Sequence, residues 1–186
     1  DTGLDYNHDD IKSNIWTNAG EIANNGIDDD NNGFVDDVRG WDFTTCERFA
    51  SGCVIIKPED NNPMDGDGHG THVSGTIAAI SNNGIGIVGV APQAHIMALK
   101  GLNDQGAGMS ADLAAAIRYA ADNGADIINM SWGGVGKSLV IEDALNYAAS
   151  LGVVLVAAAG NSSLDVSPGF YPANHHSVIA VASTDE

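Results

Sequence analysis

The sequence predicts an α/β domain with a mostly parallel sheet and helices on both faces, a three-layer arrangement. From residue 69 onward, apolar runs of strand length alternate with segments of helical length. This alternation is typical of βαβ units with right-handed crossovers. The 186 residues are enough for one domain with a sizeable core, and no internal repeat or low-complexity linker divides them. We therefore expect residues 1–186 to belong to a single domain.

The predicted elements follow one another after a long irregular start. Residues 1–68 are rich in Asp, Asn and Gly and predict surface loops. The later elements are a small-residue helix at 73–80, strands at 95–100, 126–132, 153–161 and 177–184, and amphipathic helices at 109–124 and 138–152. In the helix at 109–124, Leu113, Ile117 and Ala121 recur at helical spacing, and Gly124 provides a C-cap.

Two of these strands end in polar or glycine-rich segments. Residues 131–134 follow the strand at 126–132, and residues 160–161 close the strand at 153–161. Ligands of parallel sheets bind at the carboxyl ends of the strands. The pattern therefore predicts a binding edge at these two segments.

The composition excludes several function classes. Asp and Glu number 25 against 7 Lys and Arg, which gives a net charge of −18. Such an acidic surface repels nucleic acid and anionic lipid, and it favours solubility or cation binding. No apolar run is long enough to span a bilayer. The chain opens without Met, so we expect a processed product or a fragment, and the lack of a signal peptide says nothing about export.

The two cysteines, Cys46 and Cys53, lie in the short polar segment CERFASGC. A local disulfide is favoured over two free thiols, and it suits an oxidising compartment. No third or fourth cysteine supports a zinc site.

Two histidines, His69 and His72, stand three residues apart in GHGTHVSG (68–75). A metalloprotease helix places its histidines four apart with a glutamate between them, so a zinc pair is disfavoured. Two structural histidines remain an alternative. A catalytic base at the start of a buried helix is favoured, because imidazole exchanges protons near neutral pH.

A histidine base needs a carboxylate that orients its ring, and the chemistry it serves needs an oxyanion donor. Asp1 in DTG (1–3) is a candidate for the carboxylate, although Asp and Gly are also common in turns. Asn161 ends the apolar strand VVLVAAAGN and could project an N–H group into a site.

Four motifs together resemble the subtilisin family of serine proteases. They are DTG (1–3), GHGTHVSG (68–75), INMSWGG (128–134) and VAAAGN (156–161), in this order and spacing. The resemblance covers nearly the whole chain. It implies a subtilisin-like fold and an endopeptidase that acts on protein or peptide substrates.

Position by position, the resemblance implies that Asp1 is the triad aspartate, His69 the general base and Asn161 the side-chain oxyanion donor. His72 would be a structural neighbour. The implied substrate-binding residues are Gly106, Ala107 and Gly108, Ser131, Trp132 and Gly133, and Ala158, Ala159 and Gly160. The first two segments would pair with the substrate backbone as an added strand. The small residues of the third suggest room for a sizeable apolar side chain, and the alternative is that they are core residues of the strand. Tyr171–Pro172 corresponds to a cis proline.

The nucleophile of the resemblance is missing from the sequence. The family carries it in a Gly-Thr-Ser-Met-Ala type of motif, and neither Ser74 nor Ser162 stands in that context. The chain thus resembles an internal piece of a catalytic domain, incomplete at both ends. Without its nucleophile we expect the fragment to be inactive.

The acidic loops predict calcium. In DDDNNGFVDD (28–37), Asp28, Asp30 and Asn32 alternate before Gly33 and Asp36. This spacing resembles the first half of a calcium loop but lacks the closing glutamate, so a solvated Asx-rich turn remains an alternative.

The resemblance implies a second calcium site around Asp10. Its other ligands would be the carbonyl oxygens of Ile80, Ile85 and Ile87 and the side chain of Asn82 or Asn83. A third group, Asp60, Asn62, Asp65 and Asp67, either holds a cation or forms a polar loop. Loop-bound calcium would stabilise an extracellular protease.

Three hypotheses therefore follow from the sequence. The favoured one is a secreted subtilisin-type endopeptidase, monomeric as a full domain, with no nucleic acid or membrane partner. The second is a non-catalytic calcium-binding or peptide-binding module on the same fold. The third is a zinc hydrolase that uses His69 and His72 with His175 or His176.

Overall fold

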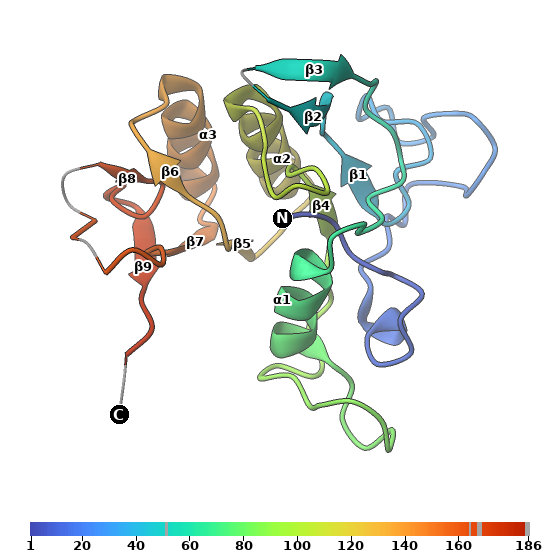
Figure 1. Cartoon of the computed structure of the whole chain (residues 1–186). Helices are drawn as coiled ribbons and strands as arrows, with labels where there is room; N and C mark the ends of the chain where they lie inside the picture. The colour runs from blue at the N-terminus through green and yellow to red at the C-terminus, as the bar shows by residue number, and fades with distance from the viewer. Residues whose placement is uncertain (51, 164, 167–168, 185–186) are drawn as a thin grey trace. The chain divides into compact units, whose positions relative to one another are not determined.

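The computed structural model describes residues 1–50, 52–163, 165–166 and 169–184, and the chain forms two compact units (Figure 1). The first unit is Asp1–Met109 and the second is Ser110–Glu186.

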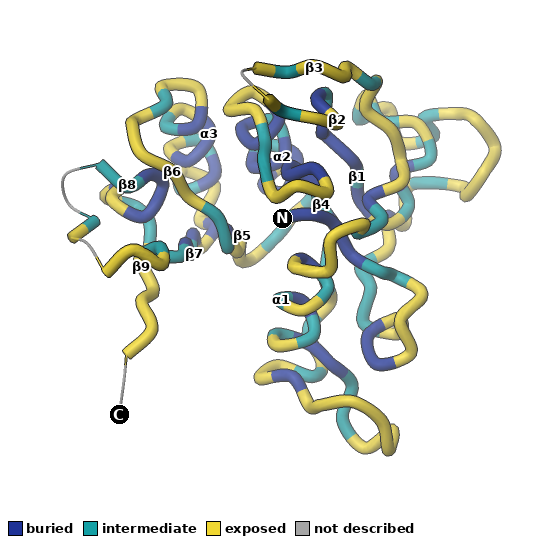
Figure 2. Tube along the Cα trace, viewed as in Figure 1, coloured by how far each residue is buried: buried dark blue, intermediate teal, exposed yellow. Residues whose placement is uncertain are grey.

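The first unit combines short strands, one longer helix and extensive loops. Its elements are η1 (Lys12–Asn14), β1 (Gly40–Asp42), β2 (Cys46–Phe49), β3 (Cys53–Ile56), α1 (His69–Ala78) and β4 (Ala98–Lys100). Strands β1 and β4 pair in parallel, with Trp41 opposite Leu99. The core of this unit contains Leu4, Ile11 and Ala98, and residues 2–4 are buried along their whole length (Figure 2). The segment that follows Asp1 is therefore an interior element.

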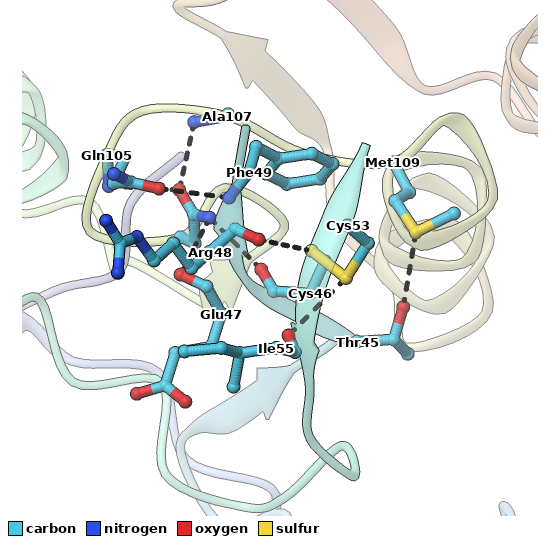
Figure 3. Close-up of a disulfide and its surroundings, with 11 residues drawn as sticks. Thr45, Cys46, Glu47, Arg48, Phe49, Cys53, Ile55, Gln105, Ala107 and Met109 are labelled. Carbon is cyan, nitrogen blue, oxygen red and sulfur yellow. Dashed lines mark hydrogen bonds between the residues drawn. A yellow bond between two sulfur atoms is a disulfide. The ribbon is translucent and has the colours of Figure 1, made fainter. Parts of the chain in front are cut away.

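Strands β2 and β3 form an antiparallel hairpin that a disulfide closes. Cys46 and Cys53 are bonded, with their Cα atoms 5.7 Å apart, which confirms the predicted local disulfide (Figure 3). Val54, Ile55 and Ile56 on β3 are exposed, so the hairpin has little apolar burial of its own. The covalent bond therefore replaces part of the core that such a short hairpin lacks.

The second unit is a small parallel sheet with two helices. Its elements are α2 (Ser110–Asp122), β5 (Ile127–Met130), β6 (Gly134–Val135), α3 (Leu139–Ser150), β7 (Val154–Ala158), β8 (Phe170–Tyr171) and β9 (Val178–Val181). The main sheet has the order β5-β7-β9 with all pairs parallel, and β6 pairs antiparallel with β8.

Helices α2 and α3 pack on each other, and α3 packs on β7. Leu145 of α3 and Leu155 of β7 are almost fully buried. At the surface of the helix pair, Arg118 forms an ion pair with Asp143 and stacks over the ring of Tyr147. The alternating burial of β7 matches a strand with one face against a helix.

The α/β class and the parallel pairing are confirmed, and β4, β5, β7, β9, α2 and α3 lie where the sequence predicts them, whereas β6 and β8 were not predicted. Two expectations were wrong. Residues 1–68 are not only loops, because they contain β1, β2 and β3. The small-residue helix starts at His69 rather than at residue 73. The Tyr171–Pro172 bond is cis, as the resemblance implied.

Among the described residues, no helix is both long enough and apolar enough to cross a lipid bilayer.

The hairpin gives a first testable expectation. Replacing both Cys46 and Cys53 by Ser should lower the free energy of unfolding by about 2–3 kcal/mol, because the unfolded chain gains the freedom that the closed loop removes. Urea unfolding with and without reductant measures this change. The wild type in reductant should match the double variant, and equal stability of all samples would contradict the role of the bond.

Candidate active site

Asp1 and His69 form the central pair of the first unit. The carboxylate oxygen Oδ1 of Asp1 lies 2.7 Å from Nδ1 of His69, although 68 residues separate them. The side chain of Asp1 is 15% exposed and that of His69 is 49% exposed. The acid is thus shielded while the imidazole reaches solvent. This arrangement orients the ring.

The backbone holds Asp1 in place. Its carbonyl oxygen accepts N–H bonds from Gly101 and Leu102, and its Oδ1 accepts the N–H of Thr2 at 2.7 Å. The buried ammonium group of Lys100 donates to the carbonyl of Thr2. Asp1 therefore lies at the end of β4, which ends at Lys100 and is followed directly by Gly101 and Leu102.

His69 opens α1, and two glycines make its position possible. Gly68 has φ 106°, a left-handed conformation that glycine adopts without strain. A Cβ atom added at Gly70 would lie 2.1 Å from the carbonyl oxygen of Gly3. Only a glycine at position 70 lets the first turn of α1 approach the segment that carries Asp1.

Asp65 joins the two partners of the pair. Its Oδ1 accepts the hydroxyl of Thr2 at 2.9 Å and the N–H of Gly68 at 2.9 Å. Its Oδ2 accepts the N–H and the hydroxyl of Thr71 at 2.9 and 2.7 Å. The hydroxyl of Thr2 in turn accepts the N–H of Gly70. One carboxylate thus ties the Asp1 segment to the first turn of α1.

These bonds also settle the ionisation of Asp65. Burial opposes the charged carboxylate, but the donors on Gly68, Thr71 and Thr2 outweigh it and hold the pKa of Asp65 well below its usual range. The sequence offered Asp65 as part of a third cation cluster. Its oxygens instead bind N–H and O–H groups of the chain itself.

His69 and His72 face different spaces. His72 lines a pocket together with His8, Asp10 and Ile87, and His69 is not among the lining residues. Among the described residues, the sole cluster of three potential metal-ligating groups contains no histidine. The geometry therefore gives a zinc site at these two histidines no support.

The segment 106–108 is held by the disulfide hairpin. Oδ1 of Asn103 accepts the N–H groups of Gln105 and Ala107, while its amide donates to the carbonyls of Cys46 and Glu47. Figure 3 shows Gln105 and Ala107 beside β2, the hairpin strand that contains Phe49. The N–H group of Phe49 donates to the side-chain oxygen of Gln105. Asn103 was missed from the sequence, because its two sets of partners are 2–4 and 56–57 residues away.

In the second unit, the two predicted wall segments follow neighbouring strands. Residues 131–133 follow β5 and residues 158–160 end β7, and these strands pair in parallel with Met130 opposite Ala157. The structure therefore brings these segments to one edge of the sheet. Asn161 is exposed and follows Gly160, which has φ 89°. It belongs to the second unit, so its approach to His69 stays a prediction.

Asp10 and Asn83, two of the residues predicted to bind calcium, are in contact. The amide of Asn83 donates to Oδ1 of Asp10 at 2.6 Å, and the N–H of Ile87 donates to Oδ2 at 2.9 Å. Asp10 is 4% exposed. The bond from the Asn83 amide, and to a smaller extent that from the Ile87 N–H, lowers the pKa of Asp10. Asn83 is thus in contact with Asp10, and the choice of the asparagine that would bind calcium stays a prediction. Ile85 donates its N–H to Asn83, and Ile80 donates to the carbonyl of Asp10.

The acidic loop assembles a different set from the one expected. Ligand-type oxygens of Glu21, Asp28 and Asp30 lie within 4.8 Å of one another. The carboxylate of Asp36 instead accepts the N–H groups of two residues in another turn, Asn25 and Gly26. The amide of Asn32 bonds to Asp30 and Asp37. Glu21 was missed because it lies seven residues before Asp28, outside any periodic pattern.

A second expectation concerns acid stability. Asp65→Asn should lower the free energy of unfolding at pH 7 by about 1–3 kcal/mol, because donors lose a charged acceptor. Since the native pKa of Asp65 is depressed, the carboxylate stabilises the fold above its unfolded value of about 4, and this contribution is lost as the pH falls further. The difference from wild type should therefore shrink below pH 4.

Denaturant unfolding at pH 7 and at pH 3 measures this difference. Asp67→Asn is the matched control, because Asp67 lies in the same loop and its side chain accepts the N–H of His69. A constant difference across the two pH values, or the same effect in both variants, would contradict the role of Asp65.

Known proteins share both the sequence and the fold of this chain. Residues 1–186 match the subtilase family. Thermitase of Thermoactinomyces vulgaris is 39% identical over 186 residues, all of this chain and 53% of that protein. A thermophilic serine proteinase of Bacillus sp. (strain AK1) is 37% identical over 186 residues, or 37% of its own length.

Among solved structures, sphericase superposes with a TM-score of 0.75 at 36% identity and covers 100% of this chain and 53% of its own. The chain thus spans about half the length of thermitase and of sphericase. The match to the family extends over every residue from the Asp1 segment to the end of the sequence. This chain belongs to the subtilase family.

Proposed function

We propose that this chain supplies the acid and the base of a serine endopeptidase that hydrolyses peptide bonds in proteins. The observation that carries the proposal is the contact of 2.7 Å between Asp1 and His69. A shielded carboxylate beside a solvent-exposed imidazole is the arrangement that a histidine general base needs.

The chemistry follows from this pair. With Nδ1 of His69 held by Asp1, Nε2 takes the proton of a serine hydroxyl that attacks the substrate carbonyl, and it later gives the proton to the leaving amine. Asp1 stabilises the charged ring during both steps. The side chain of Asn161 donates to the oxyanion. The serine lies outside these 186 residues, so the isolated chain is expected to be inactive.

The segments 106–108 and 131–133 support the same proposal. Each can offer backbone groups with which an extended peptide would pair as an added strand. The hairpin and Asn103 hold the first segment, and pairing of β5 with β7 holds the second. The proposed setting is extracellular, which the disulfide favours, and the full domain is proposed to act as a monomer.

The pair makes a direct activity prediction. In the full-length protein, His69→Ala should reduce kcat by at least about 10³-fold with little change in KM, because the base acts only in the transition state. Hydrolysis of a peptide p-nitroanilide measures both constants. His72→Ala is the control, because His72 faces another space, and it should leave kcat unchanged.

Labelling by a fluorophosphonate tests the nucleophile separately. The full-length protein should react, and its His69→Ala variant should react far more slowly. A full-length protein that neither reacts nor hydrolyses peptides would reject the protease proposal in favour of a binding module.

We propose calcium as a structural ion at two places. At the first, Asp10 and Asn83 supply a carboxylate and an amide, and Gly86 packs so closely that an added Cβ would lie 1.9 Å from Oδ2 of Asp10. At the second, the oxygens of Glu21, Asp28 and Asp30 converge. The ligand atoms would be the carboxylate oxygens of these residues and the side-chain oxygen of Asn83, and such hard donors suit Ca²⁺ and not zinc. Bound calcium would offset the repulsion among these carboxylates.

Thermal unfolding with calcium and with EGTA tests this proposal. At 100 times the Kd, calcium should add about 2.7 kcal/mol to the free energy of unfolding and raise the Tm. Asp10→Asn and Asp30→Asn should each remove part of the shift, because they belong to different sites. Asp9→Asn is the control, since Asp9 is exposed and pairs with Lys12. The absence of any shift on chelation would exclude calcium.

A further inference from the structure

The side chain of Asn103 lies between the disulfide hairpin and the turn that follows β4. Its amide group donates to the carbonyl oxygens of Cys46 at 3.1 Å and Glu47 at 3.0 Å. Its Oδ1 accepts the N–H groups of Gln105 at 2.9 Å and Ala107 at 3.2 Å. Asn103 is 2% exposed. A side-chain amide has two donors and an oxygen that can accept two bonds, so this buried side chain is fully paired.

The backbone of Asn103 closes the same turn. Its N–H donates to the carbonyl of Ala107 at 2.9 Å, and its carbonyl accepts the N–H of Gly106 at 2.9 Å. The φ of Gly106 is 71°, a conformation that glycine adopts without strain. The path of the chain into the segment 106–108 is therefore set by one residue, which is also bonded to the hairpin.

Two further contacts join the hairpin to the residues on either side of this segment. The N–H of Phe49 donates to the side-chain oxygen of Gln105 at 3.1 Å, and the hydroxyl of Thr45 lies 3.7 Å from the sulfur of Met109 (Figure 3). The segment 106–108 is thus held before, within and after its length by one element.

The hairpin itself depends on its disulfide. Its strands pair with register shifts, and β3 exposes three apolar side chains, those of Val54, Ile55 and Ile56. A short two-stranded hairpin with little buried surface is only marginally stable in water. Cys46 takes part in both links, because its sulfur is bonded to Cys53 and its carbonyl accepts the amide of Asn103. The acceptor that Asn103 uses is therefore fixed by the covalent bond.

We propose that Asn103 is a positioning residue for the substrate and that the Cys46–Cys53 bond acts through it. The bond fixes the two hairpin carbonyls, Asn103 relays their position to the turn, and the segment 106–108 thereby presents its backbone to an extended peptide. This inference rests on the proposed peptidase function. The disulfide then governs how tightly long peptides bind, and it leaves the chemistry of Asp1 and His69 unchanged.

Two substrates of different length test this role in the full-length protein. A tetrapeptide p-nitroanilide can pair with the segment 106–108 as a strand, whereas an acetylated single-residue p-nitroanilide with the same last residue cannot. In Asn103→Ala, KM for the tetrapeptide should rise about 10-fold with kcat little changed, the pattern for lost binding that is equal in ground and transition states. The kcat/KM for the short substrate should change by less than about 2-fold.

A second variant separates the two sets of bonds that Asn103 makes. Asn103→Asp keeps an oxygen that accepts the N–H groups of Gln105 and Ala107, but it loses the donors to the carbonyls of Cys46 and Glu47. If the link to the hairpin matters, this variant should show the same rise in KM as Asn103→Ala. It retains both cysteines, so it tests the link even where variants without the disulfide fail to fold.

Removal of the disulfide should have the same effect. The double variant Cys46→Ser/Cys53→Ser, and wild type treated with dithiothreitol, should both raise KM for the tetrapeptide and spare the short substrate. In the second case dithiothreitol gives two electrons and two protons to the bridge, so that two thiols form and the reagent closes to a cyclic disulfide. Arg48→Gln is the matched control, because its exposed side chain belongs to the same strand, and it should leave both substrates unaffected.

The outcomes distinguish this inference from the proposed function, and the Tm of each variant reports whether the fold is retained. Equal losses for the short and the long substrate in folded Asn103 variants would overturn the inference and leave the protease proposal standing. A wild-type KM in Asn103→Asp would overturn it as well. Hydrolysis of neither substrate by wild type would overturn the proposed function and this inference with it.

Discussion

The carboxylate of Asp65 is the acceptor on which the geometry of the first unit depends. It binds the hydroxyl of Thr2 next to Asp1, and it binds the N–H and hydroxyl of Thr71 in the first turn that His69 opens. No backbone ladder connects these two segments within the described residues. Besides the contact of the acid with the base, the two segments are joined by the bond from the N–H of Gly70 to the hydroxyl of Thr2 and by that from the N–H of Asp5 to the hydroxyl of Thr71. A charged acceptor with several donors is stronger than neutral hydrogen bonds and fixes direction as well as distance.

The acidic loops use the same principle. Glu21 accepts the N–H groups of Asp29, Asp30 and Asp36, and Asp28 accepts those of two residues further along its loop. Many of the acidic side chains in these loops therefore accept hydrogen bonds from irregular backbone and do not form a charged surface for a partner. These oxygens are also the ones that hard cations prefer. A loop with few apolar residues can thus be ordered by its own N–H groups, and calcium would add to that order.

In both units, glycines allow neighbouring groups to approach the backbone closely, and this fixes the local geometry. In the first, Gly70 lets α1 reach the carbonyl of Gly3, which places His69 beside Asp1. In the second, Gly133 and Gly160 leave room that the ring of Phe170 fills. The same absence of a side chain brings the candidate acid and base together in one case and admits a neighbouring ring in the other. A glycine in a motif therefore does not by itself indicate an open pocket.

The sequence alone determined the α/β class, the order of the later elements, the disulfide and the identity of Asp1 and His69 as candidate partners, because these depend on periodicity, spacing and local motifs. The sequence did not predict strand β1, because its three residues carry no periodic signal. They pair with β4, 58 positions later in the chain. Only the tertiary structure placed Asp65, Asn103, Glu21 and Phe170, whose partners come from distant segments. Their roles depend on distances between those segments, and side-chain chemistry at one position does not contain that information.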